Sequence, residues 1–139
     1  MTVQNVNGET RVDVRQHHEL AGEISPTNHG VHFVVYQFMN LFRFIDEINV
    51  DYKELRSEKL KMFNFNMGDN LFITSNVDRP VVLIRAYFTN ESESEDLSLE
   101  SEIALTYEEW ESFVAALSQI KECVYLHGNE AEKKSTLIF

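Results

Sequence analysis

The chain has one cysteine, Cys123, and only two prolines in 139 residues. A lone cysteine forms no internal disulfide, so we expect a reducing intracellular setting, in the nucleus or the cytoplasm. The sequence also lacks any uninterrupted apolar run of about 18 residues. Its first residues, MTVQNVNGET, show no basic segment followed by an apolar one. We therefore expect neither a membrane-spanning helix nor a secretory signal.

Basic residues are also scarce. Twelve Lys and Arg oppose 23 Asp and Glu, which gives a net charge of −11 with neutral histidines. Residues 1–69 hold 7 basic and 10 acidic groups, whereas residues 70–139 hold 5 and 13. A nucleic-acid-binding protein usually has a basic surplus, because released phosphate counterions supply much of its affinity. Overall electrostatic attraction to a polyanion is therefore excluded as a mechanism for this chain.

Two segments show the apolar spacing of an amphipathic helix, one in 35–52 and one in 107–124. The second begins at Thr106 and Glu109, which have the spacing of a capping box. The two apolar stripes align position by position, and we expect both to pack in the core. In this alignment Phe38, Leu41, Ile45 and Ile48 correspond in turn to Trp110, Phe113, Leu117 and Ile120.

The match between the two segments extends upstream into strand-like sequence. The segment VDVR at 12–15 corresponds to VLIR at 82–85, with connectors to the helices of nearly equal length. Any two amphipathic helices can be aligned, but the shared upstream strands favour an internal duplication. We predict an α+β fold with a β-β-β-α unit at 1–56 and a β-β-β-β-α unit at 57–126. Residues 127–139 are predicted to form a flexible polar tail.

Two stretches of the second unit resemble the single-stranded-DNA-binding domain of the transcriptional positive cofactor four family. They are VVLIRAYF at 81–88 and EIALTYEEWESFVAALSQI at 102–120, and GVHFVVYQFMNLFRFIDEI at 30–48 is similar. In that family two copies pack through their helices, and their curved sheets form a channel for unpaired strands. The resemblance therefore implies a tandem duplication folded as one pseudo-twofold, helix-to-helix packed domain. Such a chain would be a pseudo-dimeric monomer or a homodimer.

This resemblance implies a non-enzymatic role in binding single-stranded DNA or RNA, as a transcription cofactor does. Basic side chains would contact phosphates, and aromatic rings would stack on bases. About half of the aromatics would instead face the core, and an ion pair is an equal alternative for Arg15 and Arg85. The candidate residues are Arg11, Arg15, Lys61, Phe63, Phe65, Phe72, Arg79, Arg85, Tyr87 and Phe88.

The sequence departs from the family at the hairpin before the second helix. Where the family has basic residues, this chain has the acidic segment ESESED at 91–96. The alternative function is therefore an acidic protein-interaction module that has lost nucleic-acid binding. Such a module would bind a basic protein partner through the loop 91–96.

The chain lacks the usual signatures of catalysis. It has no GxSxG, Walker, dinucleotide-binding or HExxH motif. His17, His18, His29 and His32 could approach Glu19 or Glu23, but neighbouring histidines on a strand point to opposite faces. We expect no enzymatic activity, no cofactor and no metal site.

Overall fold

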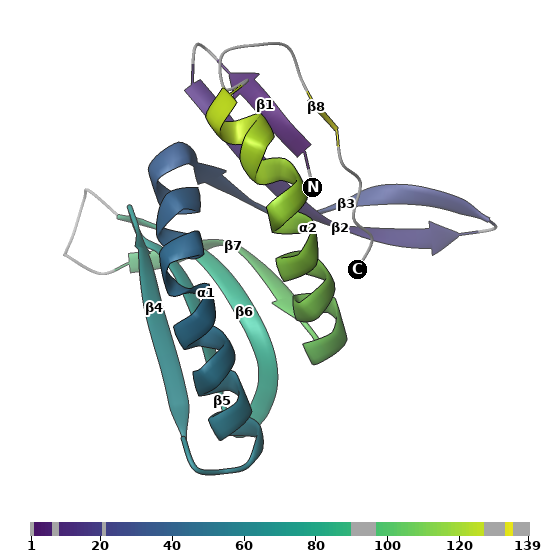
Figure 1. Cartoon of the computed structure of the whole chain (residues 1–139). Helices are drawn as coiled ribbons and strands as arrows, with labels where there is room; N and C mark the ends of the chain where they lie inside the picture. The colour runs from purple at the N-terminus through teal and green to yellow at the C-terminus, as the bar shows by residue number, and fades with distance from the viewer. Residues whose placement is uncertain (1, 7–8, 21, 90–96, 127–132, 135–139) are drawn as a thin grey trace.

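A computed structural model of the chain describes residues 2–6, 9–20, 22–89, 97–126 and 133–134 (Figure 1). The elements are β1 (Thr2–Val6), β2 (Glu9–Leu20), β3 (Glu23–Val34), α1 (Val35–Arg56), β4 (Met62–Gly68), β5 (Leu71–Asn76), β6 (Arg79–Thr89), β7 (Leu97–Leu105), α2 (Tyr107–Leu126) and β8 (Lys133–Lys134). They form two four-stranded antiparallel sheets and two helices, so the fold is α+β as predicted.

The two sheets have corresponding strand orders. The first sheet is ordered β3-β2-β1-β8, and the second, from its β7 edge, is ordered β7-β6-β5-β4. In the first sheet Val14 pairs with Val31, and in the second Ile84 pairs with Ile103. The sequence match aligns Val14 with Ile84 and Val31 with Ile103. Residues that correspond in sequence therefore occupy corresponding pairs in the two sheets.

The strand β8 lies within residues 127–139, for which the sequence predicts a flexible polar tail. Its two residues pair with the start of β1, with Lys134 opposite Thr2 and Lys133 opposite Val3. The rest of that tail, 127–132 and 135–139, lies outside the described residues. Because β8 completes the first sheet, the C-terminal end of the chain contributes to the half formed by the N-terminal strands.

Each helix also packs on strands of the other half (Figure 1). The helix α1 follows β3 and packs on β2 and β3, but it also lies against β4 and β5. The helix α2 packs on β6 and β7, and it also contacts β1. The halves 1–56 and 57–126 are therefore interlocked, and neither covers its own sheet alone.

The core lies between the helices and the sheets. Seven of the eight expected core residues are buried, and Ile45 is half-buried and packs against the same cluster. On α1 the buried face continues to Tyr52 and Leu55, whose side chains are 1% exposed. The apolar periodicity of both helices therefore marks the face that each one buries.

The first turn of each helix is capped by side-chain hydrogen bonds. In α2, Thr106 N donates to Glu109 Oε1 (3.0 Å) and Glu109 N donates to Thr106 Oγ1 (3.3 Å), which completes the capping box. In α1, Val34 N donates to Gln37 Oε1 (2.8 Å), while Gln37 Nε2 donates to Gly68 O (2.7 Å). Gln37 therefore caps α1 and also ties it to the end of β4.

The hairpin between β4 and β5 turns at Asp69 and Asn70, both of which have positive φ (48° and 62°). This is the conformation of a type I′ turn, which matches the twist of the flanking strands. Gly68 before the turn has φ +105°, and a Cβ there would lie 2.6 Å from Tyr36 Cε2. A glycine is therefore required both by the backbone and by the close approach of α1.

Candidate functional site

The outer face of the second sheet, turned away from the helices, brings together three of the predicted nucleic-acid-binding residues. Phe72 on β5 pairs with Arg85 on β6, which pairs with Glu102 on β7. The rings of Phe72 and Tyr87 meet edge to face, with centroids 5.6 Å apart. Phe72, Arg85 and Tyr87 are all half-buried. This group, called the β6 patch below, combines two aromatic rings with one cation.

The positive charge of Arg85 is compensated by Glu102, which lies beside the patch on β7. Its Nε donates to Glu102 Oε2 at 2.5 Å, and it also hydrogen-bonds the Tyr87 side chain. Burial lowers the pKa of Arg85, but the bonds to Glu102 and Tyr87 raise the pKa by more. The guanidinium is therefore held charged by a carboxylate that a phosphate would have to displace.

Arg15, which occupies the corresponding position on β2, is also paired with a carboxylate. Its Nε and Nη2 each lie 3.4 Å from a carboxylate oxygen of Asp13, and His32 Nδ1 lies 3.1 Å from Asp13 Oδ1. Burial raises the pKa of Asp13, but hydrogen bonds from His32 and Arg15 outweigh it, so the pKa is lowered overall. A Cβ at Gly30, opposite Arg15, would lie 3.1 Å from the Val14 carbonyl oxygen and 3.4 Å from Arg15 Nε, so the tight approach there is to the backbone of β2.

A polar hollow of about 350 Å³ lies beside this cluster, between the first and second sheets. Arg15 and His32 line it from the first sheet, and Tyr87 and Glu100 line it from the second, with Asp69 from the β4–β5 turn. The lining charges are of both signs, so the hollow favours neither an anion nor a cation.

The remaining predicted cations lie elsewhere. Arg11 is half-buried on β2, whereas Lys61 and Arg79 are exposed near the hairpin between β5 and β6. Val77 N, in that hairpin, donates to Lys61 O (2.8 Å). Arg79 begins β6 and Arg85 lies well along it, about 20 Å away at the usual rise of a strand. The described cations therefore do not form one continuous stripe.

Two predicted stacking residues, Phe63 and Phe65, belong to the core instead. Phe63 is 5% exposed, and its ring lies 6.3 Å from that of Tyr52 on α1. Phe65 is half-buried, with its ring 5.8 Å from that of Phe44 on the same helix. Alternate residues of β4 face α1, so both rings pack toward that helix, Phe63 within the core and Phe65 against it. Phe88, by contrast, is 47% exposed.

Sequence reasoning missed the two carboxylates that hold the arginines, Asp13 and Glu102. Glu102 faces Arg85 only through the register of β6 and β7. Asp13 and Arg15 are next-but-one neighbours, the spacing of side chains on one face of a strand, and this signal was present in the sequence.

The second half of the chain is the more acidic. Residues 86–120 hold nine Asp and Glu and no Lys or Arg. Within this stretch Glu100, Glu108 and Glu111 are exposed, and Glu109 is half-buried. The acidic loop 91–96 lies outside the described residues, between the ends of β6 and β7.

The described part of the chain contains no group of three or more His, Cys, Asp or Glu side chains that could hold a metal ion. Among the described residues, neither helix combines the length and apolar character needed to cross a bilayer. His17, His18 and His29 have side chains outside the description, and His32 bonds to Asp13.

No protein-family model, curated protein or solved structure matches the chain.

Proposed function

We propose that this chain is a non-enzymatic protein-interaction module, built on a doubled fold of the cofactor-four type, that binds a basic partner through its acidic second half. The doubling is supported by the corresponding strand orders and by the equivalent pairs Val14–Val31 and Ile84–Ile103. It is also supported by the way each helix packs on a strand of the other half. An approximate twofold rotation that exchanges the two halves accounts for the strand orders, the equivalent pairs and the packing of the helices.

The observation that favours a protein partner over a polyanion is the pairing of both equivalent arginines with carboxylates. Arg85 is held by Glu102 and Arg15 by Asp13. A phosphate that displaced either carboxylate would leave a partly buried anion without its cation, which is costly. With a net charge of −11, the chain gains nothing from long-range attraction to nucleic acid.

The partner-binding surface is the acidic stretch that includes the loop 91–96. Opposite charge on a partner speeds association and selects against acidic competitors. No Lys or Arg lies within residues 86–120, so the acids of the loop 91–96 have no basic neighbour in the sequence, whereas Glu102 is paired with Arg85. Ser92 and Ser94 lie between the acids of the loop, and their phosphorylation would strengthen the same attraction.

The test compares two variants with the same change in charge. The loop variant Glu91→Gln/Glu93→Gln/Glu95→Gln removes three acids from the surface, and the control Asp46→Asn/Glu47→Gln/Glu54→Gln removes three exposed acids from α1. Fluorescence anisotropy with a labelled lysine-rich peptide at physiological salt measures the affinity. We expect roughly tenfold weaker binding for the loop variant and little change for the control. Equal losses would show attraction by net charge alone and would contradict the proposal.

A second candidate function is binding of single-stranded nucleic acid by stacking, which the β6 patch favours. Phe72 and Tyr87 would offer ring surfaces on one face of the sheet, each worth roughly 1–3 kcal/mol per stacked base. Because Arg85 is compensated, this binding would depend weakly on salt. Binding of an unpaired oligonucleotide that Phe72→Ala abolishes would favour this candidate over the first.

A further inference from the structure

The two helices run antiparallel (Figure 1). Their side chains form different contacts at the two ends of the helix pair. At one end Lys121 of α2 lies over the ring of Phe42 of α1, with Nζ 4.9 Å from the centroid. In the alignment of the two helices Phe42 corresponds to Val114 and Lys121 to Asn49, and this second pair lies at the other end. Val114 and Asn49 are both smaller than their counterparts. The space between them is a pocket of about 280 Å³.

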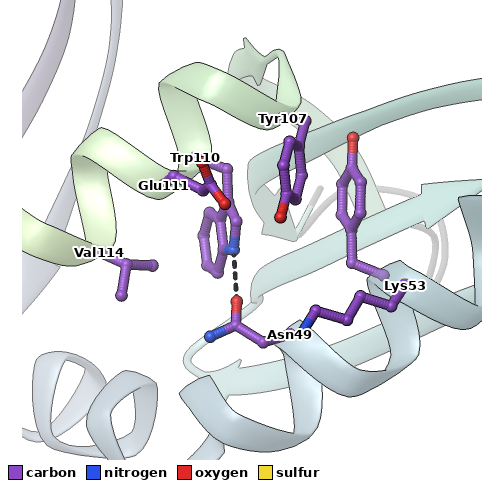
Figure 2. Close-up of a pocket in the computed structure, with 7 residues that line it drawn as sticks. Asn49, Lys53, Tyr107, Trp110, Glu111 and Val114 are labelled. Atoms are coloured by element: carbon purple, nitrogen blue, oxygen red, sulfur yellow. Dashed lines mark hydrogen bonds between the residues drawn. The ribbon is translucent and has the colours of Figure 1, made fainter.

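Figure 2 shows how the aromatic walls of this interhelical pocket are arranged. Tyr107 and Trp110 come from the first turns of α2, and Tyr52 comes from α1. Trp110 Nε1 donates to Asn49 Oδ1 at 2.8 Å, which fixes the indole against α1. Val114 adds an aliphatic surface beside the indole. These side chains would enclose one flat apolar ring.

The polar groups of the pocket favour an anion on that ring. The bond from Trp110 uses the Asn49 oxygen and leaves Asn49 Nδ2 without a partner among the residues that the structure describes. Lys53, which is exposed, lines the same side. Both groups are hydrogen-bond donors, and a carboxylate could accept from the two together.

The charged groups around the opening of the pocket also favour an anionic ligand. Arg56 lies over the Tyr107 ring, 4.2 Å from its centroid, and Lys53 adds a second cation. The one lining carboxylate, Glu111, already accepts a hydrogen bond from the Tyr107 side chain. Lys53, Arg56 and Glu111 together give a local charge of +1, on a chain whose net charge is −11.

We infer that the interhelical pocket binds a small aromatic carboxylate. Its ring would pack against Tyr107, Trp110 and Val114, and its carboxylate would accept hydrogen bonds from Lys53 Nζ and Asn49 Nδ2. The volume lies near the lower end for small-molecule sites, about 300 Å³, so the pocket has room for one ring and its carboxylate. The same chemistry occurs in a free acid and in the C-terminal phenylalanine of a peptide. This inference does not rest on the acidic surface proposed above.

The test uses Trp110, the only tryptophan, as a reporter inside the pocket. The wild-type protein is titrated with phenylacetate, phenylacetamide and phenethylamine, which share a ring and differ in charge. We expect a saturable change in tryptophan fluorescence with phenylacetate, at least tenfold weaker binding of the amide, and none of the amine. Equal binding of the acid and the amide, or no binding of the acid, would overturn the inference. A Gly-Gly-Phe peptide, acid or amidated, then distinguishes the two sources.

Two variants localise the binding. The variant Val114→Phe introduces the residue that α1 has at the corresponding position 42. The larger ring should fill the pocket and abolish the response to phenylacetate. Lys53→Met should weaken phenylacetate binding about tenfold without affecting the amide. The matched control, Lys59→Met, removes an exposed lysine beyond the end of α1 and should leave both affinities unchanged. Unaltered binding by a folded Val114→Phe protein would contradict the assignment, and the comparison of head groups requires no variant to fold.

Discussion

Arg15 and Arg85 show how one residue type is neutralised in two different ways at corresponding places. Arg85 pairs across strands with Glu102, whereas the residue opposite Arg15 is Gly30 and its carboxylate comes from Asp13 on the same strand. In both cases the cation is compensated within its own sheet. At the residue scale, therefore, these two of the predicted phosphate contacts are held in ion pairs within the fold.

The Asp13 carboxylate should make the stability of the protein depend on pH. Its pKa is lowered in the folded state, so its contribution is present above its ordinary pKa of about 3.9 and is lost as the pH falls through the folded value. We expect Asp13→Asn to lower the melting temperature most near pH 6–7 and progressively less below about pH 4. Thermal melts across this range test it, with the exposed Asp46→Asn as control. A difference that does not change with pH would contradict the ion pair.

Truncation of the buried ring of Phe38 tests the apolar face of α1. The Phe38 side chain is fully buried, and the centroid of its ring lies 5.0 Å from the centroid of the Phe42 ring. We expect Phe38→Ala to reduce the free energy of unfolding by roughly 3–5 kcal/mol, because it leaves a large cavity. Val50→Ala on the same helix is the control, since Val50 is 56% exposed and its loss should cost little. Urea denaturation measures both, and a nearly neutral Phe38→Ala would mean that this face does not meet the core.

At the scale of elements, both helices and the strands of the second sheet could be predicted from sequence because their patterns are local. The helical stripes repeat every three to four residues, β4 alternates between apolar and polar residues, and β6 is the longest apolar run, with turn signals between the strands. The strand β8 could not be predicted, because two lysines have no pattern and pair with β1 from the other end of the chain. The alternation of Phe63 and Phe65 with asparagines marks the buried face of β4, but the sequence could not show that α1 covers this face.

The contact between the β4–β5 hairpin and the start of α1 depends on Gly68. An alanine there would have an unfavourable positive φ, and its Cβ would lie 2.6 Å from the Tyr36 ring. Gly22 also has positive φ (+82°), but a Cβ there would meet nothing within 4 Å. We therefore expect Gly68→Ala to lower the melting temperature clearly more than Gly22→Ala does. Equal effects would show that the close approach of Tyr36 contributes nothing.

At the scale of the whole molecule, the interlocked helices should make folding a property of both halves. Because α1 packs on β4 and β5, and α2 on β1, each half alone would expose apolar surface that the other covers. We expect separate chains of residues 1–59 and 60–139 to lack a cooperative thermal transition, and an equimolar mixture to regain one. Circular dichroism measures both. A cooperative transition in either chain alone would mean that the halves are independent domains.

The candidate functions differ most directly in how the whole molecule responds to a polyanion. The measurement is fluorescence anisotropy of a labelled unpaired oligonucleotide, titrated with the full chain at low and at physiological salt. Because its equivalent arginines are paired with carboxylates and its net charge is −11, the chain should show no saturable binding at either salt concentration. Saturable binding that weakens steeply as salt rises would show that phosphates reach these cations, and it would contradict the account.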